Sequence, residues 1–250
     1  MQKCLFVALC FLVSVPFTSS SSSSKSSSFC PCEIVDRPDI WQKELMARWM
    51  VHTLDWGVLS TISTRLSTRS PFGNVYSFVD GSCRNATGIP YFYGTYLDQS
   101  FQDMKQNPQA SFTLSEASFN SVCIAKSSST STNKTSGAPL KACAIHAPTS
   151  HHHHSSHSGD PENPVCARLT LTGTLTPVHN TTLEFATIQA AMFVRHATMR
   201  DWPQDHGWTI VKLQIEDVWL IDYFGGASII KVKDYFAAQL IPDEMDRVHV

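Results

Sequence analysis

The sequence lacks the short motifs and charge runs that identify several large protein classes. It contains no run of five or more lysines and arginines, and its net charge is -2. The basic footprint typical of nucleic-acid-binding proteins is therefore missing, and we expect no nucleic-acid partner. The motifs of serine hydrolases, zinc proteases, P-loop enzymes, dinucleotide-binding enzymes and EF-hand proteins are also absent. These absences exclude the commonest motif-bearing classes, but not a cofactor-binding barrel, which often has no short signature.

The chain also has no apolar run long enough for a comfortable membrane span, which needs ~20 residues. Its one strongly apolar run, from Cys4 to Phe17, follows Lys3 and precedes a tract of small residues. This arrangement is typical of a secretory signal peptide. We therefore expect a signal peptide over residues 1–20, no membrane span after its cleavage, and a final location outside the cell or in a lysosome or vacuole.

Two further features fit entry into the secretory pathway. Acceptor sequences for N-glycosylation at Asn85, Asn133 and Asn180 all fall in predicted loops. With Cys4 and Cys10 assigned to the signal peptide, six of the eight cysteines remain. An even number in an oxidising compartment indicates disulfides, but the residues alone do not choose between the possible pairings.

Two segments have compositions that cannot bury apolar surface. Residues 21–35 begin with a serine run and predict a disordered linker. Residues 124–163 are rich in serine and threonine, and five of the chain's eleven histidines lie between residues 151 and 157. Adjacent histidines can chelate metal, but a loop without a second shell to orient them favours a solvated low-complexity insert with no metal site. The folded domain is then expected over 36–240, followed by a tail at 241–250.

The spacing of apolar residues outside these segments predicts mainly β structure with flanking helices. Helices are expected at 36–53, 100–108 and 183–197, and strands at 56–63, 74–80, 89–96, 110–117, 166–178 and, as a pair, within 208–226. Consecutive strands joined by short turns favour an antiparallel sheet that closes into a barrel, with helices over its openings.

Two polar segments set among aromatics are candidates for chemistry. Arg195 and His196 end a predicted helix, with Asp205 and His206 in the loop that follows. They could clamp an anion or phosphate, or simply cap the helix carbonyls, since cations are favoured at a helix C-terminus. The segment "DYFGG" from Asp222 could let a planar ligand approach bare backbone, or could be a sharp bend after a strand.

Six blocks in this order identify a resemblance: "ARWMVHTLDWGVLSTIS", "PFGNVYSFVDG", "GIPYFY", "CARLTLTGTL", "FVRHATMRDWP" and "DYFGGA". Together they resemble the CREG family of secreted glycoproteins, from Ala47 to about Ala237. The resemblance implies a split β-barrel related to the flavin-binding pyridoxamine-phosphate oxidases. It also implies a homodimer with an occluded flavin pocket, no catalytic residues and a role in growth or differentiation control through an unidentified protein partner or receptor.

The resemblance also suggests specific sites. A disulfide between Cys123 and Cys166 would close the base of the insert, although Cys143 leaves a competing pair open. The expected cofactor is none. The alternative is an FMN-dependent oxidoreductase or flavin-binding protein, whose pocket candidates would be Thr61, Ser63, Arg195 and His196. Metal binding through the histidine-rich loop is a third hypothesis.

Overall fold

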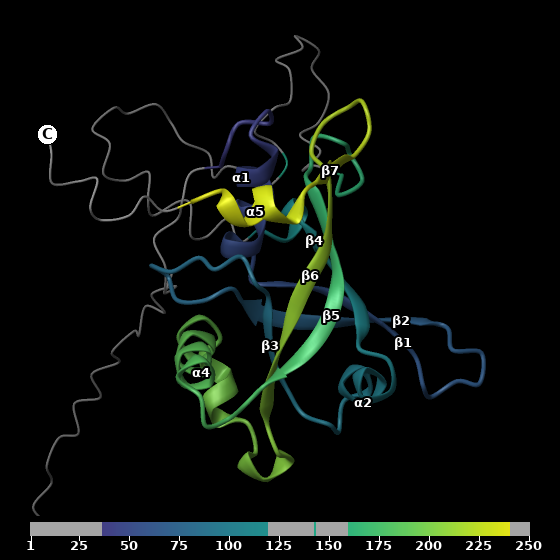
Figure 1. The fold of residues 1–250 in the computed structure, drawn as a ribbon, viewed down its shortest axis with the longest axis vertical. Coiled ribbons are helices and arrows are strands. Elements are labelled where there is room, and N and C mark those ends of the chain that lie inside the picture. The colour runs from purple at the N-terminus through teal and green to yellow at the C-terminus, as the bar shows by residue number, and fades with distance from the viewer. Residues whose placement is uncertain (1–36, 120–142, 144–159, 241–250) are drawn as a thin grey trace, which may run out of the picture.

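The computed structural model describes residues 37–119, 143 and 160–240, and all the strands among them belong to one antiparallel sheet. Its strands are β1 (Trp56–Ile62), β2 (Pro71–Val79), β3 (Tyr91–Gly94), β4 (Gln109–Ser115), β5 (Arg168–Val178), β6 (Thr209–Ile221) and β7 (Ser228–Ile230). They lie in the order β3-β2-β1-β4-β5-β6-β7, and pairing of β3 with β6 closes the first six into a barrel (Figure 1). The expected antiparallel split barrel with flanking helices is confirmed.

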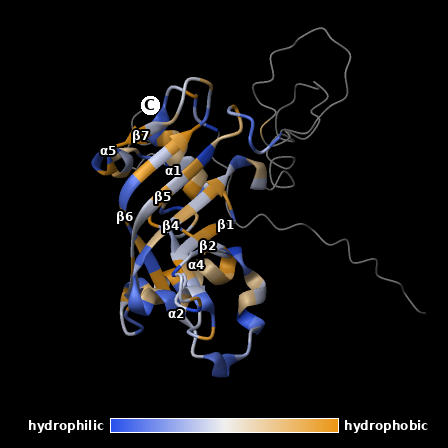
Figure 2. Cartoon of the chain, turned by 90° about the vertical axis from the view of Figure 1, so that its right-hand side faces the viewer, coloured by the Kyte–Doolittle hydropathy of each residue, from blue (hydrophilic) through white to orange (hydrophobic). Residues whose placement is uncertain are grey.

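The strands of the barrel alternate between buried and more exposed residues, so that each strand has one face toward the interior and one toward the outside. In β5 the leucines at 169, 171 and 175 point inward and the threonines between them point outward. More and less hydrophobic residues therefore alternate along this part of the sheet (Figure 2). Phe112 lies in the middle of the interior, with ring centroids 4.8 Å from both Phe78 and Phe92 in edge-on geometry. This arrangement suits the quadrupoles of aromatic rings.

The helices cover the barrel in three places (Figure 1). They are α1 (Lys43–Thr53), α2 (Gln99–Gln106), α4 (Leu183–Arg195) and α5 (Val232–Ala237). Helices α1 and α5 pack together at one end, where seven consecutive α1 residues from Met46 to His52 are buried. Helix α2 packs beside β1, and α4 lies against β2 and β3 over a second, smaller core. Glu184 fixes the start of α4 by accepting from the Tyr91 hydroxyl at 2.8 Å and the Lys212 ammonium at 2.7 Å.

One element differs from the sequence prediction. The segment 208–226 is not a strand pair but a single long strand, β6, and its hairpin partner β7 begins only at Ser228. The reversal is made by Gly225 and Gly226, whose φ angles of 111° and 102° suit glycine. The strand continues as far as Ile221 because β5 pairs with it along its whole length, which no local pattern reveals.

Several predictions lie outside the described residues. These are the signal peptide, the serine-rich linker, the C-terminal tail, most of the insert with its histidines, Cys123 and Asn133. Within the described ranges, no helix has both the length and the apolar character needed to cross a membrane. The same ranges contain no group of three or more histidine, cysteine or acidic residues arranged to hold a metal.

Candidate functional site

Two of the four predicted pocket residues lie at the far end of β1, where its hairpin with β2 begins. The Thr61 hydroxyl donates to Asp103 Oδ2 at 2.8 Å. Ser63 Oγ accepts from the Arg65 N–H at 3.3 Å. Both side chains are almost fully buried, with 2% and 1% of their surface exposed. Both hydroxyls therefore already make hydrogen bonds within the chain.

Asp103, in α2, is the centre of this cluster and was not found by sequence reasoning. Its Oδ1 accepts from the Thr64 N–H at 2.7 Å, the Thr64 hydroxyl at 2.8 Å and the Gln99 amide at 2.6 Å. Burial alone would raise the pKa of this carboxyl, but the hydrogen bonds outweigh burial and hold the pKa below its ordinary value. The available sequence signal was spacing: Asp103 lies three residues after Ser100 in a predicted helix. The structure places both residues on the buried side of α2.

The other two predicted pocket residues lie at the end of α4. The Arg195 guanidinium donates to the His52 carbonyl at 2.6 Å and lies 3.9 Å from the Asp55 carboxylate. The His196 ring lies 3.0 Å from the Phe78 carbonyl through Nε2. Burial lowers the pKa of His196, so the neutral ring is favoured, and its Nε2–H then donates to this carbonyl. Both side chains hold α4 against the start of β1 and the end of β2.

The four residues therefore do not form one pocket within a chain. Phe78 donates to Asp55, next to the first residue of β1, whereas Thr61 lies five residues further along that strand. At ~3.4 Å per residue these two places are about 17 Å apart. In addition, each of the four side chains already makes a hydrogen bond within the chain. The residues present in one chain do not fit FMN.

The anion clamp suggested for the loop after α4 stays a prediction. His206 Nε2 is 3.9 Å from Asp205 Oδ1, and both side chains are solvent-exposed. The loop is held instead by tryptophans: the Trp208 indole donates to the Pro203 carbonyl at 2.6 Å, and the Trp202 and Trp208 rings are 4.8 Å apart.

The "DYFGG" segment is the bend between β6 and β7. Asp222 is buried and accepts from the Lys43 ammonium at 2.5 Å, which ties the bend to the start of α1. Tyr223 and Phe224 are 40% and 66% exposed. The geometry matches the bend that the sequence left as one of two interpretations.

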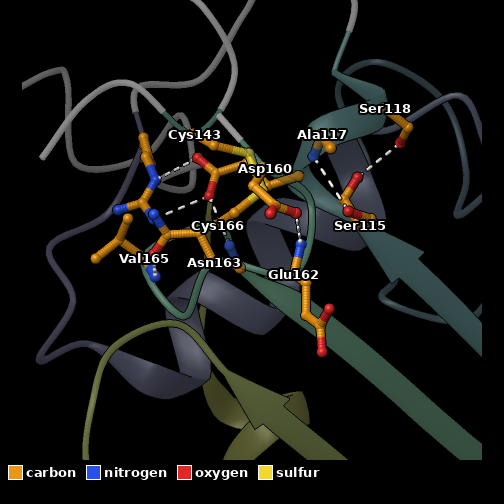
Figure 3. Close-up of a disulfide and its surroundings, with 12 residues drawn as sticks. Ser115, Ala117, Ser118, Cys143, Asp160, Glu162, Asn163, Val165 and Cys166 are labelled. Carbon is orange, nitrogen blue, oxygen red and sulfur yellow. Dashed lines mark hydrogen bonds and ion pairs between the residues drawn. A yellow bond between two sulfur atoms is a disulfide. The ribbon is translucent and has the colours of Figure 1, made fainter. Parts of the chain in front are cut away.

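The structure places a disulfide between Cys166 and Cys143, the competing pair that the sequence left open, with 4.4 Å between their Cα atoms (Figure 3). Cys123 lies outside the described residues, so its pairing with Cys166 stays a prediction. Cys166 lies at the end of a turn in which its N–H donates to the Asn163 carbonyl at 2.8 Å. Cys143 and Cys166 are 23 positions apart in the sequence. Their disulfide closes a shorter loop than a bridge from Cys123 would, and a shorter loop costs less entropy to close. Cys83 is also disulfide-bonded.

A buried ion pair lies directly beside this disulfide and was also missed. Arg37 donates to both oxygens of Glu116, at 2.6 and 3.1 Å, and both side chains are almost fully buried. Glu116 also accepts from the N–H of Ala167, the residue after Cys166, at 2.9 Å. One carboxylate therefore links the N-terminal arm, the end of β4 and the start of β5.

The two described glycosylation sequences lie at the surface. Asn85 and Asn180 are exposed in loops, as predicted. Their threonines have structural roles: the Thr87 hydroxyl donates to the Asp80 carbonyl, and the Thr182 hydroxyl caps α4 by accepting from Phe185. Each asparagine can therefore be replaced without disturbing the hydrogen bonds that its threonine makes.

A row of uncharged side chains crosses the outside of the barrel. Cross-strand partners in β2, β1, β4, β5, β6 and β7 form the outer row: Val75, Val58, Thr113, Thr170, Trp219 and Ile229. Val75 and Ile229, at its two ends, are 62% and 66% exposed, and Trp56 beside it is 43% exposed. Exposed apolar side chains gathered on one face of a protein often mark an interaction site.

Comparison with known proteins decides the family. A family model described as "CREG, beta-barrel" matches residues 38–237. The chain belongs to the CREG family. Human Protein CREG1 is 33% identical over 192 residues, which cover 76% of this chain and 72% of that protein. Mouse Protein CREG2 is 35% identical over 193 residues, which cover 77% of this chain and 55% of the relative.

Solved structures place this CREG family member in the split-barrel fold. A heme-binding protein from Mycobacterium smegmatis superposes with a TM-score of 0.53 at 16% identity, over 82% of this chain and 63% of the other. At this identity the likeness concerns the fold and not the ligand.

Proposed function

We propose that this CREG family member is a non-catalytic glycoprotein of the secretory pathway that acts as a homodimer by binding other proteins. The observation that carries the proposal is the use of the pocket candidates in internal hydrogen bonds. Thr61 and Ser63 are buried, Arg195 and His196 bind backbone carbonyls, and the two pairs are far apart. Growth or differentiation control is the role that family membership suggests.

Flavin binding tests the absence of a cofactor. Protein purified from a secretory host should be colourless and should take up no added FMN in an absorption titration. A preparation with flavin absorption bands would contradict the proposal. The alternative function, a flavin-dependent oxidoreductase with a site shared by two protomers, gains support only from the barrel fold and would be favoured by that result.

The outer row supports the homodimer. Its six side chains are apolar or threonine, and a second copy is a suitable partner because a two-fold interface must be complementary to itself. A surface without charge satisfies that condition with no like-charge repulsion across the axis. Light scattering at micromolar concentration should give a dimer for the native chain and a monomer for Val75→Glu.

A matched control for the dimer is Leu183→Glu, which places the same charge on a residue that is 82% exposed at the start of α4. This variant should remain dimeric. A native chain that is monomeric, or a Val75→Glu variant that stays dimeric, would refute this role for the outer row.

Glycosylation is tested by intact mass before and after enzymatic deglycosylation. Asn85→Gln and Asn180→Gln should each remove one glycan mass and leave the fold unchanged, because neither asparagine side chain is buried. Replacing Thr87 or Thr182 is a poorer test, since their hydroxyls stabilise the loop and the helix. A native mass equal to that of the unmodified chain would reject the glycoprotein assignment.

A further inference from the structure

The groups around Asp103 are arranged as donors around a small oxyanion. Four of them converge on this one carboxylate at 2.6–2.8 Å, namely the Thr61 hydroxyl, the Thr64 N–H and hydroxyl, and the Gln99 amide. We propose that the end of β1 is an oxyanion cradle and that Asp103 fills it as a ligand supplied by the chain itself. The inference goes beyond the proposed function, because it concerns a binding site that exists whether or not the chain dimerises or binds partners.

The chemistry of the donors argues for an anion site and against an ordinary ion pair. All four donors are neutral, yet the carboxylate has no exposed surface. Buried carboxylates are usually compensated by a cation, because desolvating a charge costs several kcal/mol. Here hydroxyl and backbone N–H donors provide the compensation, as they do where proteins bind phosphate or carboxylate groups.

Most of the cradle is built independently of the helix that fills it. Thr61 and Thr64 belong to β1 and the hairpin loop after it, which is closed by the Ser63 N–H donating to the Ser70 carbonyl at 2.9 Å. The Arg65 N–H donates to Ser63 Oγ and holds the same loop. Removing the carboxyl group of Asp103 therefore leaves three of the four donors in place.

Helix α2 is likewise held by contacts other than Asp103. The Asp98 side chain caps its first turn by accepting from the Ser100 N–H at 2.8 Å, and Asp98 also accepts from the Tyr76 hydroxyl. Phe101 and Met104 pack into the main core. Loss of the carboxyl group should vacate the cradle without releasing the helix.

Two residues of the cradle reach the surface. Thr64 and Gln99 are only half-buried, and Arg65 next to the cradle is exposed. The ligand class is a small oxyanion, either a carboxylate or a phosphate group. A phosphate could come from the free ion or from a nucleotide such as FMN, and the experiment separates these sources.

The test is anion-dependent thermal unfolding of the full chain with Asp103→Ala, using sodium formate, inorganic phosphate or FMN, against chloride at the same ionic strength. Formate or phosphate, at a concentration roughly five times its Kd, should raise the Tm of Asp103→Ala by about 2–4 °C, the shift expected for ~1 kcal/mol of linked binding in a chain of this size. The native chain and Asp103→Asn, whose side chain still fills the cradle, should show no shift beyond chloride.

The outcomes are distinct. A further rise with FMN over phosphate would identify a nucleotide-binding cradle, and equal rises would identify a site for free phosphate; both support the proposal. No response of Asp103→Ala, or an equal response of the native chain, would overturn it.

If Asp103→Ala does not fold, Asp103→Ser is refolded with each anion, and a folded yield no higher in formate or phosphate than in chloride overturns the proposal. FMN bound by the native chain with the same affinity in Asp103→Ala would refute the non-catalytic assignment but not the cradle.

Discussion

Two buried carboxylates, Asp103 and Glu116, both precede the insert in the sequence but are stabilised by different means. Asp103 is surrounded by neutral donors from α2, from the end of β1 and from the loop that follows β1. Glu116 forms a two-bond ion pair with Arg37, 79 residues away, and also binds the backbone 51 residues further on at Ala167. The proposed cradle would accept another anion only once the Asp103 carboxyl group is removed, whereas the second arrangement is a clamp that depends on one cation. We expect mutations to separate the two.

The largest effect is expected at the clamp. Arg37→Ala leaves the Glu116 charge buried without its cation, and should lower the free energy of unfolding by about 3–5 kcal/mol. Denaturant unfolding measures the change. The double variant Arg37→Ala/Glu116→Gln should recover part of the loss, because the uncompensated charge is gone; a double variant less stable than the single one would contradict the clamp.

Removing the disulfide beside the clamp should have the next largest effect. Cys143→Ser opens a loop with a sequence separation of 23 and should cost about 3 kcal/mol. A non-reducing peptide map of the native protein should join the peptides of Cys143 and Cys166. A map that pairs Cys166 with Cys123 would restore the pairing expected from the family resemblance.

Emptying the oxyanion cradle should cost less than breaking the clamp. Asp103→Ala orphans the buried Thr61 hydroxyl, while water can reach the half-buried Thr64 and Gln99, so we expect a loss of about 1–3 kcal/mol. The same unfolding assay compares it with Arg37→Ala. If Asp103→Ala lowers the free energy of unfolding more than Arg37→Ala does, the proposed difference between the two carboxylates is wrong.

The smallest expected effect is a difference between the native chain and Asp103→Asn in how their stability depends on pH. Because the folded pKa of Asp103 is lowered, its contribution is fully present above the unfolded pKa of ~3.9 and is lost as the pH falls through the folded value. Below pH ~4 the native chain should therefore lose stability faster than Asp103→Asn, by at most about 1.4 kcal/mol per pH unit. Urea unfolding over a pH series measures both slopes, and parallel curves would contradict the assignment.

Much of the fold could be predicted because it depends on local patterns. Alternation in β1, β4 and β5 and the apolar spacing of α4 identified these elements within a few residues. The end of β6 was missed, since the last residues of this strand are held by pairing with β5 on one side and β7 on the other. Arg195 and His196 were chosen as polar residues beside aromatics, and Thr61 and Ser63 as strand residues for the flavin alternative. Only their partners in space reveal that each is already hydrogen-bonded.

The sequence by itself determined the strand and helix order, the family and the positions of the glycosylation sequences, because each of these depends on residues close together in the chain. Tertiary structure decided which cysteine joins Cys166, which buried carboxylate pairs with Arg37 and which one fills the cradle at Thr61. Those pairings connect residues tens of positions apart. They follow from the closure of the barrel, since strand pairing brings distant side chains within hydrogen-bonding distance and burial then requires each polar group to find a partner.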